Sequence, residues 1–140
     1  MNPLFVITLM VVSLLAGCAT TNQHVLDMGD QTQLQKRSYQ SRIFDTAEKE
    51  KVLRATISTL QDLGFIIDRA DLMLGSVSGT KLDINQAIRI TVSARPKGAD
   101  RMLVRANAQF NLSPIEDPKH YQDFFTSLEK SLFLTAHAGE

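Results

Sequence analysis

The chain is 140 residues long, a length typical of a single domain. Hydrophobic residues make up 44% and charged residues 21%, which is too apolar a composition for a disordered chain. Fifteen basic residues balance fifteen acidic ones, so the chain lacks the excess positive charge with which proteins bind phosphate backbones. The composition therefore argues against a nucleic-acid partner. A single cysteine excludes an internal disulfide.

The chain begins with an uncharged, strongly apolar segment. Residues 4–16 read LFVITLMVVSLLA, a run shorter than the roughly 20 apolar residues that a transmembrane helix needs. Its length is typical of the hydrophobic region of a signal peptide, and the small residues Ala16 and Gly17 lie at its end. The three residues before the run contain no Lys or Arg, which departs from the usual pattern. The sequence predicts a signal peptide over residues 1–17.

The only cysteine lies directly behind this segment. Leu15-Ala16-Gly17-Cys18 resembles the lipobox of bacterial lipoproteins, and the resemblance implies that Cys18 is acylated and becomes the mature N-terminus. Several acyl chains on one residue anchor a protein stably to a membrane. Ala19, and not Asp, follows the cysteine, which by the sorting rule of enteric Gram-negative bacteria implies the outer membrane, with the domain facing the periplasm. The alternative is a buried cysteine in a signal-anchor helix.

The next residues are polar and follow no strict period, so residues 18–37 are predicted to form the acylated cysteine and a flexible tether. The periplasmic domain is expected over residues 38–137, beginning with a short strand over residues 38–44. Asp45 with Glu48 has the pattern of a helix start, and apolar residues at helical spacing predict a helix that ends before Gly64.

Four further strands are expected over residues 65–70, 75–81, 85–95 and 101–112. The last two alternate apolar and polar residues strictly, which indicates that one face is buried and the other is exposed to water. Residues 96–100 contain Pro and Gly and are predicted to form the hairpin loop between these strands. Asp117-Pro118 then begins a final helix, because Pro is favoured at the first helical position.

The order β-α-β-β-β-β-α predicts an α+β fold: a two-layer sandwich with an antiparallel sheet and both helices on one face. This arrangement resembles the helix-grip fold of periplasmic lipoprotein domains. A group of small proteobacterial outer-membrane lipoproteins resembles the chain more closely. The shared features are a helix ending in LQDLGF, a G-x-[VI]-x-[GA]-x-K strand and a closing Y-x-x-FF-x-x-L helix. This resemblance implies fold and location but no activity.

The exposed face of the two long strands is the candidate docking face. It is defined by Arg89, Arg95, Arg105, Asn107 and Gln109, which are expected to project away from the helices. Such a face is either ordinary solvated surface or a protein-binding surface, since Arg is enriched at interfaces. A free edge strand offers a second way to bind a partner, by β-augmentation. We therefore expect a non-enzymatic accessory or docking subunit of a cell-envelope complex of the secretion, efflux, pilus or barrel-assembly type.

An alternative function is a carrier or sensor of an apolar ligand or lipid held between the sheet and the helices. The candidate pocket consists of Tyr121, Phe124, Phe125, Val92 and Val104. The aromatic stripe on the last helix suggests this function, although such a stripe also packs ordinary cores.

Catalysis has little support in the sequence. His24, His120 and His137 are scattered and lack the spacing of metal ligands. The sequence GSVSG does not match the G-x-S-x-G elbow, because its central residue is Val77. Loop carboxylates such as Asp68 are ordinary turn residues, unless two of them converge in a cleft. We expect no enzymatic activity, no metal and no cofactor.

Overall fold

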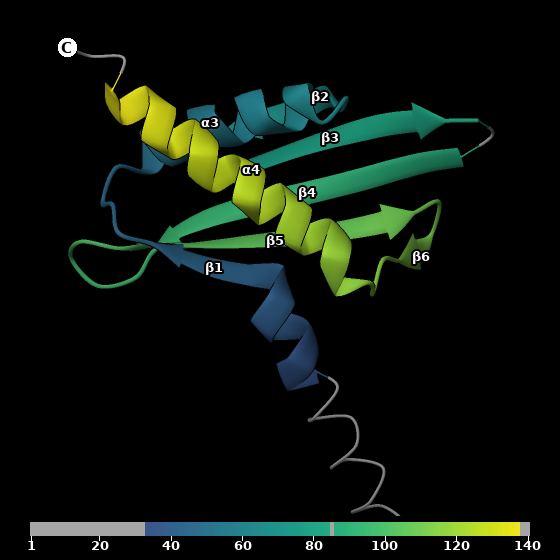
Figure 1. Cartoon of the computed structure of the whole chain (residues 1–140), viewed down its shortest axis with the longest axis horizontal. Helices are drawn as coiled ribbons and strands as arrows, with labels where there is room; N and C mark the ends of the chain where they lie inside the picture. Colours follow the sequence, from purple (N-terminus) through teal and green to yellow (C-terminus); the bar gives the residue numbers. More distant parts are fainter. Residues whose placement is uncertain (1–32, 85, 138–140) are drawn as a thin grey trace, which may run out of the picture. The chain divides into compact units, whose positions relative to one another are not determined.

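The computed structural model describes residues 33–84 and 86–137, and its elements follow the predicted order (Figure 1). They are β1 (Ser41–Phe44), α3 (Lys49–Asp62), β2 (Ile66–Asp71), β3 (Ser76–Asp83), β4 (Gln86–Pro96), β5 (Met102–Phe110), β6 (Ser113–Pro114) and α4 (Pro118–His137). The two-residue strand β6 is the one strand of this series that was not predicted. Residues 1–32, which include the signal peptide, Cys18 and most of the tether, lie outside the described residues.

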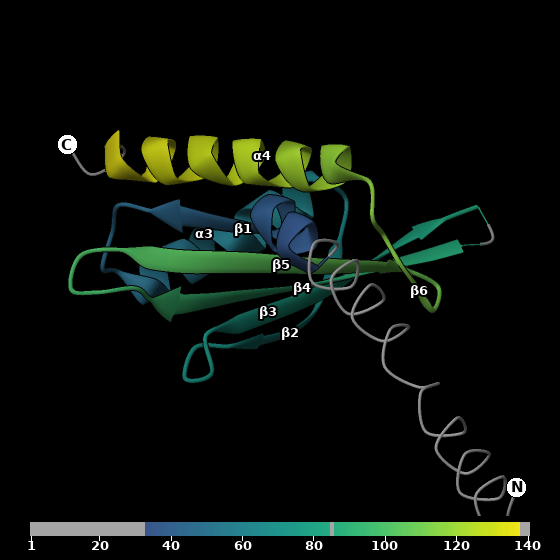
Figure 2. The same ribbon diagram turned by 90° about the horizontal axis from the view of Figure 1, so that it is seen from below.

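All strand pairings in the sheet are antiparallel, and the strand order is β1-β5-β4-β3-β2, with β6 paired to β5. Figure 2 shows α4 lying along one side of the sheet, and α3 packs between α4 and strands β2, β3 and β4. Both helices therefore cover the same face, as the sequence predicts. No helix of residues 33–84 and 86–137 lies over the opposite face, which we call the open face.

The core lies between the helices and the inward-facing side chains of the sheet. Strands β4 and β5 supply Val92, Val104 and Ala106, all of which are fully buried. Helix α4 supplies Tyr121 and Phe125, with exposed fractions of 1% each. Burial of this apolar surface is the main free-energy gain that holds the two layers together.

The C-terminus of α3 confirms the predicted role of Gly64. Gly64 has a φ of 84°, a left-handed conformation that a residue without a Cβ adopts readily. The Gly64 N–H donates to the carbonyl of Gln61, and the Phe65 N–H donates to that of Leu60. These two bonds form a Schellman motif, which satisfies carbonyls at the helix end and turns the chain into β2.

The N-terminus of α3 lies later than the sequence predicts, and the expected capping box of Asp45 and Glu48 does not form. The helix begins at Lys49, and the residue before it makes no side-chain cap. Instead, the Thr46 hydroxyl accepts a hydrogen bond from the N–H of Glu48. Because β1 stays paired to β5 as far as Phe44, the residues after it form the connection to the helix layer.

Residues 33–40 are helical, which differs from the prediction of a tether to residue 37 and a strand from residue 38. The ring of Tyr39 contacts that of Tyr121 at a centroid separation of 5.3 Å, and Gln40 Nε2 donates to the Tyr121 hydroxyl. Strand pairing with β5 begins at Ser41. The alternating pattern of residues 38–44 predicted a strand from residue 38. The packing of Tyr39 on α4 instead favours a helix up to residue 40.

The turn between β2 and β3 requires glycine at position 75. Gly75 has a φ of 70°, its carbonyl accepts a hydrogen bond from the N–H of Ala94, and a Cβ there would lie 2.5 Å from the Ala94 oxygen. Any other L-amino acid at position 75 would therefore require the backbone of the turn or of β4 to move. The glycine therefore sets how closely this turn packs against β4.

Candidate functional site

The five residues of the candidate docking face lie together on the open face. In the β4–β5 ladder, Arg89 is opposite Gln109, Thr91 is opposite Asn107, and Ser93 is opposite Arg105. Side chains alternate between the two faces of a strand, so Arg95 shares this face. The strict alternation in the sequence therefore brings these polar residues to one surface.

The arginines of this face have no carboxylate partner, unlike six other cations of the described residues. Arg89, Arg95 and Arg105 form no ion pair with any carboxylate in the described part of the chain, and Arg105 Nε donates to the hydroxyl of Ser41. On the helices, by contrast, Arg54 pairs with Glu50 at 2.6 Å. The open face along β4 and β5 consequently carries positive charge that the described residues do not neutralise.

A hollow of about 330 Å³ indents this face. It is lined by Ser93, Arg95, Leu103, Arg105 and Asn107. Leu103 is half-buried and provides an apolar surface between polar neighbours. Two guanidinium groups at one hollow match the geometry of a carboxylate, because Arg presents a planar fork of N–H donors. Strands β1 and β2 are the end strands of the sheet, and within the described residues no further strand pairs with them.

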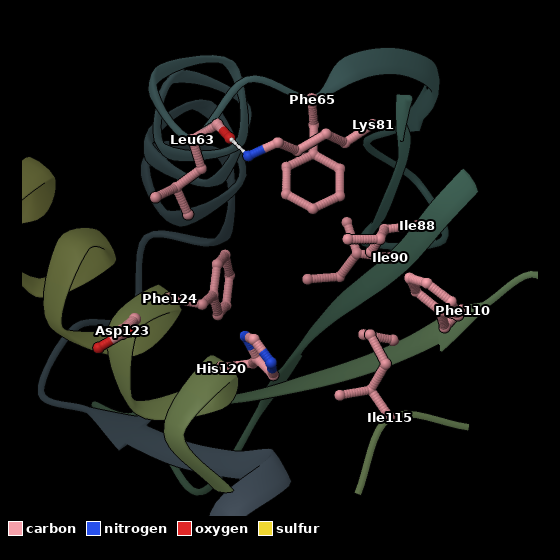
Figure 3. Close-up of a pocket in the computed structure, with 11 residues that line it drawn as sticks. Leu63, Phe65, Lys81, Ile88, Ile90, Phe110, Ile115, His120, Asp123 and Phe124 are labelled. Atoms are coloured by element: carbon pink, nitrogen blue, oxygen red, sulfur yellow. Dashed lines mark hydrogen bonds between the residues drawn. The ribbon is translucent and has the colours of Figure 1, made fainter. Parts of the chain in front are cut away.

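A second, larger cavity of about 460 Å³ lies on the helix-covered side of the sheet. Figure 3 shows its walls, which come from the end of α3, the sheet, the segment before α4 and the first turns of α4. Most of its lining is apolar, from Leu63, Phe65, Ile88, Ile90, Ala108, Phe110, Ile115 and Phe124. Three polar residues complete it, namely Lys81, His120 and Asp123.

Hydrogen bonds hold two walls of this cavity in place. The Tyr121 hydroxyl donates to the Ile115 carbonyl at 2.8 Å and accepts from the Ala108 N–H at 3.2 Å. The Ile115 N–H in turn donates to the Ala108 carbonyl. On the other side, Gly79 lets β2 approach β3, because a Cβ there would lie 3.0 Å from the Ile66 oxygen. The cavity is thus shaped by the fold before any ligand binds.

The polar residues of the cavity have different environments. Lys81 Nζ donates to the Leu63 carbonyl at 3.0 Å, at the C-terminus of α3, where a positive charge is favourable. Asp123 accepts from Lys119 at 3.1 Å, and Figure 3 shows its carboxylate turned away from the cavity. The same view shows the His120 ring directed into the cavity. Of the two lining residues Lys81 and Asp123, only Lys81 therefore forms no ion pair within the described part of the chain.

The predicted apolar pocket falls mostly in the packed core. Val92, Val104, Tyr121 and Phe125 are at most 1% exposed and do not line the cavity, whereas Phe124 does. The cavity lies instead towards the N-terminus of α4. One sequence feature points to it: Lys81 occupies an inward-facing position of β3, two residues after the buried Gly79. A cation at a core-facing position is unusual and marks a special environment.

Three titratable groups with shifted pKa values lie at structural contacts. The hydrogen bond from Lys36 to Glu116 raises the pKa of Lys36, and burial raises the pKa of Tyr39. The pKa of Asp71 is lowered, mainly because the carboxylate accepts a hydrogen bond from the Leu74 N–H. Among the described residues, no three His, Cys, Asp or Glu side chains gather to hold a metal ion.

Comparison with protein-family models and with curated proteins finds no match for this chain. Over residues 33–84 and 86–137, no helix combines the length and the apolar character needed to cross a membrane.

Proposed function

We propose that the chain is a lipoprotein of the outer membrane, anchored through Cys18, whose periplasmic domain is a non-enzymatic docking subunit of a cell-envelope complex. The observation that supports it most directly is that Arg89, Arg95 and Arg105 on the open face have no carboxylate partner among the described residues. Arginines on a sheet face that no helix of the described residues covers can bind a partner without rearrangement of the core. The lipobox-like sequence supports the anchor.

The partner that best fits this face is a protein surface bearing Asp or Glu side chains. Arg95 and Arg105 border the hollow around Leu103, so a carboxylate can bind both guanidinium groups while an apolar group contacts the leucine. Asn107 and Gln109 add amide donors and acceptors along β5. The mixture of charge, amide and one apolar surface is typical of a protein interface.

A crosslinking experiment in intact cells tests this docking face. A photo-reactive amino acid replaces Thr91 on the open face or, as the control position, Ser58 on the exposed side of α3. We expect one defined protein to be crosslinked from Thr91 and not from Ser58. Crosslinking from Thr91 should be lost with Arg89→Glu and Arg105→Glu and retained with Arg54→Glu, a matched charge reversal on α3. Crosslinking that survives both open-face reversals contradicts the proposal.

The lipid anchor is tested separately. Cells fed radioactive palmitate should label the wild-type chain, and Cys18→Ser should remove the label and release the protein from the membrane fraction. Each buried CH₂ contributes about 0.8 kcal/mol, so loss of the acyl chains removes nearly all membrane affinity. A Cys18→Ser chain that stays in the outer-membrane fraction would show that another part of the protein holds it there.

A further inference from the structure

We propose that the 460 Å³ cavity binds a single-chain anionic amphiphile, with its acyl chain between the sheet and α4 and its acidic head group at Lys81. This inference is independent of the docking face, because the two sites lie on opposite sides of the sheet. It assigns a ligand-binding site to residues that the aromatic stripe of α4 does not reveal.

The size and lining of the cavity fit an acyl chain. Small-molecule sites in proteins have volumes of about 300–1,000 Å³ and are mostly apolar with a few polar groups. At about 460 Å³, this cavity lies within that range, and eight of its eleven lining residues are apolar. The Ile90 and Phe124 side chains are buried in its walls, while Ile88 and Phe110 are partly exposed to it. Filling the cavity would therefore remove further apolar surface from water.

The charge of the cavity selects an anion. An ammonium group has three N–H donors, and within the described residues Lys81 uses only one, to the Leu63 carbonyl. A ligand that displaces water from Lys81 must supply acceptors in its place, because burying an uncompensated charge is costly. A carboxylate or phosphate does so, whereas a neutral head group compensates the charge less and a cationic one is repelled.

The neighbouring polar residues support the same head-group position. Asp123 is paired with Lys119 and turned away from the cavity, so its carboxylate does not neutralise Lys81 there. The His120 ring faces the cavity in Figure 3 and has a nitrogen that can donate a hydrogen bond to an anion. The apolar surface and the cation thus lie in one cavity, which is the pattern that an amphiphile requires.

The experiment compares three ligands that share one alkyl chain and differ only in charge. Laurate, lauryl alcohol and dodecyltrimethylammonium are titrated by calorimetry into the purified full chain. We expect laurate to bind at least about tenfold more tightly than the alcohol, the effect of a hydrogen bond to a charged group, and the cation to bind most weakly. Equal affinity for all three, or no binding of laurate, would overturn the proposal.

Variants separate head-group recognition from the fit of the chain. Lys81→Met should reduce laurate affinity about tenfold and leave the alcohol unchanged, while Lys81→Arg keeps the preference for laurate. Lys97→Met, which removes a cation from the exposed β4–β5 loop, is the matched control and should bind like the wild type. If Lys81→Met retains the wild-type preference, Lys81 is only a cap for α3 and the head-group assignment is wrong.

A second pair of variants tests the location. Ile88→Trp fills the cavity and should abolish binding of laurate and of the alcohol, whereas Ile43→Trp adds the same bulk on the open face and should not. Thermal unfolding of both variants confirms that they are folded. Wild-type affinity in folded Ile88→Trp would place the ligand elsewhere and overturn the proposal. Titration with lauroyl-lysophosphatidylglycerol then shows which class of anionic lipid the cavity prefers. Tighter binding than that of laurate indicates a phospholipid, and weaker binding indicates a free fatty acid.

Discussion

The two faces of the sheet share the same strands but differ in what surrounds their side chains. On the helix-covered face, Val92 and Val104 are fully buried under the helices. On the open face, the next residues along the same strands, Ser93 and Arg105, line a hollow at the surface. Packing explains the residues of the first face almost completely. It does not explain the open-face arginines, and the comparison therefore directs the search for a partner to that face.

The largest expected effect is on the covered face. Phe125→Ala removes a ring that is 1% exposed and that lies under the Arg42 guanidinium at 5.2 Å, so it should reduce the free energy of unfolding by about 3–5 kcal/mol. Leu82→Ala, on the open face and 74% exposed, is the control and should change it by less than about 0.5 kcal/mol. Urea unfolding measures both. Similar losses would show that the open face is also packed.

The second-largest loss of stability is expected at the β2–β3 turn, where the backbone at Gly75 packs closely against β4. Gly75→Ala combines a positive φ with a Cβ placed 2.5 Å from the Ala94 oxygen, and we expect a loss of about 2–4 kcal/mol. Gly98→Ala has a similar φ of 76° but no atom within 4 Å, so it should lose only about 1 kcal/mol. The difference between the two variants in thermal unfolding isolates the steric contribution. Equal losses would show that the turn shifts freely.

A smaller effect is expected at the wall of the cavity. Tyr121→Phe removes the hydroxyl that bonds the Ile115 carbonyl and the Ala108 N–H, and should reduce the free energy of unfolding by about 1–2 kcal/mol. Hydrogen exchange should become faster at the Ala108 amide, while that of the α3 amides is changed only by the global loss of stability. Unchanged exchange at Ala108 would show that the β-ladder alone holds this wall.

A pH-dependent contact lies at the β2 edge of the open face. Because the hydrogen bond from Leu74 lowers the pKa of Asp71 in the folded protein, the contact stabilises the fold above the unfolded carboxyl pKa of about 3.9 and is lost as the pH falls below it. Asp71→Asn should remove this part of the acid sensitivity. Urea unfolding at neutral and acidic pH measures how much stability each protein loses in acid. An equal loss in the wild type and in Asp71→Asn would show that Asp71 is not the group responsible.

The smallest effect on stability is expected from the open-face arginines. Arg89→Gln with Arg105→Gln should change the free energy of unfolding by less than about 0.5 kcal/mol, because these side chains have no carboxylate partner among the described residues. Urea unfolding of the double variant tests this. The same variant should reduce partner binding, and the reduction should shrink as added salt screens the charges. A large loss of stability would show that the arginines hold the fold together.

Much of the fold was predictable because its patterns are local and strong. Period-2 alternation in β4 and β5 correctly assigned Arg89 and Gln109 to the same face. Gly64 and the Asp117-Pro118 pair correctly marked helix boundaries, and the Asp117 carboxylate accepts from the Lys119 N–H as a cap does. The predicted starts of α3 and of the first strand were wrong, because strand pairing and aromatic packing with distant residues determine where these elements begin.

The cavity could not be predicted in the same way. The aromatic stripe of α4 includes both core and cavity residues, and its period does not tell Phe125 from Phe124. The sequence analysis did not single out Lys81, although a cation at a core-facing position of β3 could have indicated this environment. The cavity exists because the end of α3, strands β3, β4 and β5, the segment before α4 and α4 itself leave a space between them, and no single segment shows it.

The amino-acid sequence alone indicates which side chains share a face and where the chain turns, because alternation, helical spacing and left-handed glycines act over a few residues. It also carries the lipobox-like motif around Cys18. Only the tertiary structure decides that Lys81 lies at an apolar cavity and that Arg89, Arg95 and Arg105 lack carboxylate partners among the described residues. These properties depend on distances between segments far apart in the chain, and packing of the two layers sets those distances.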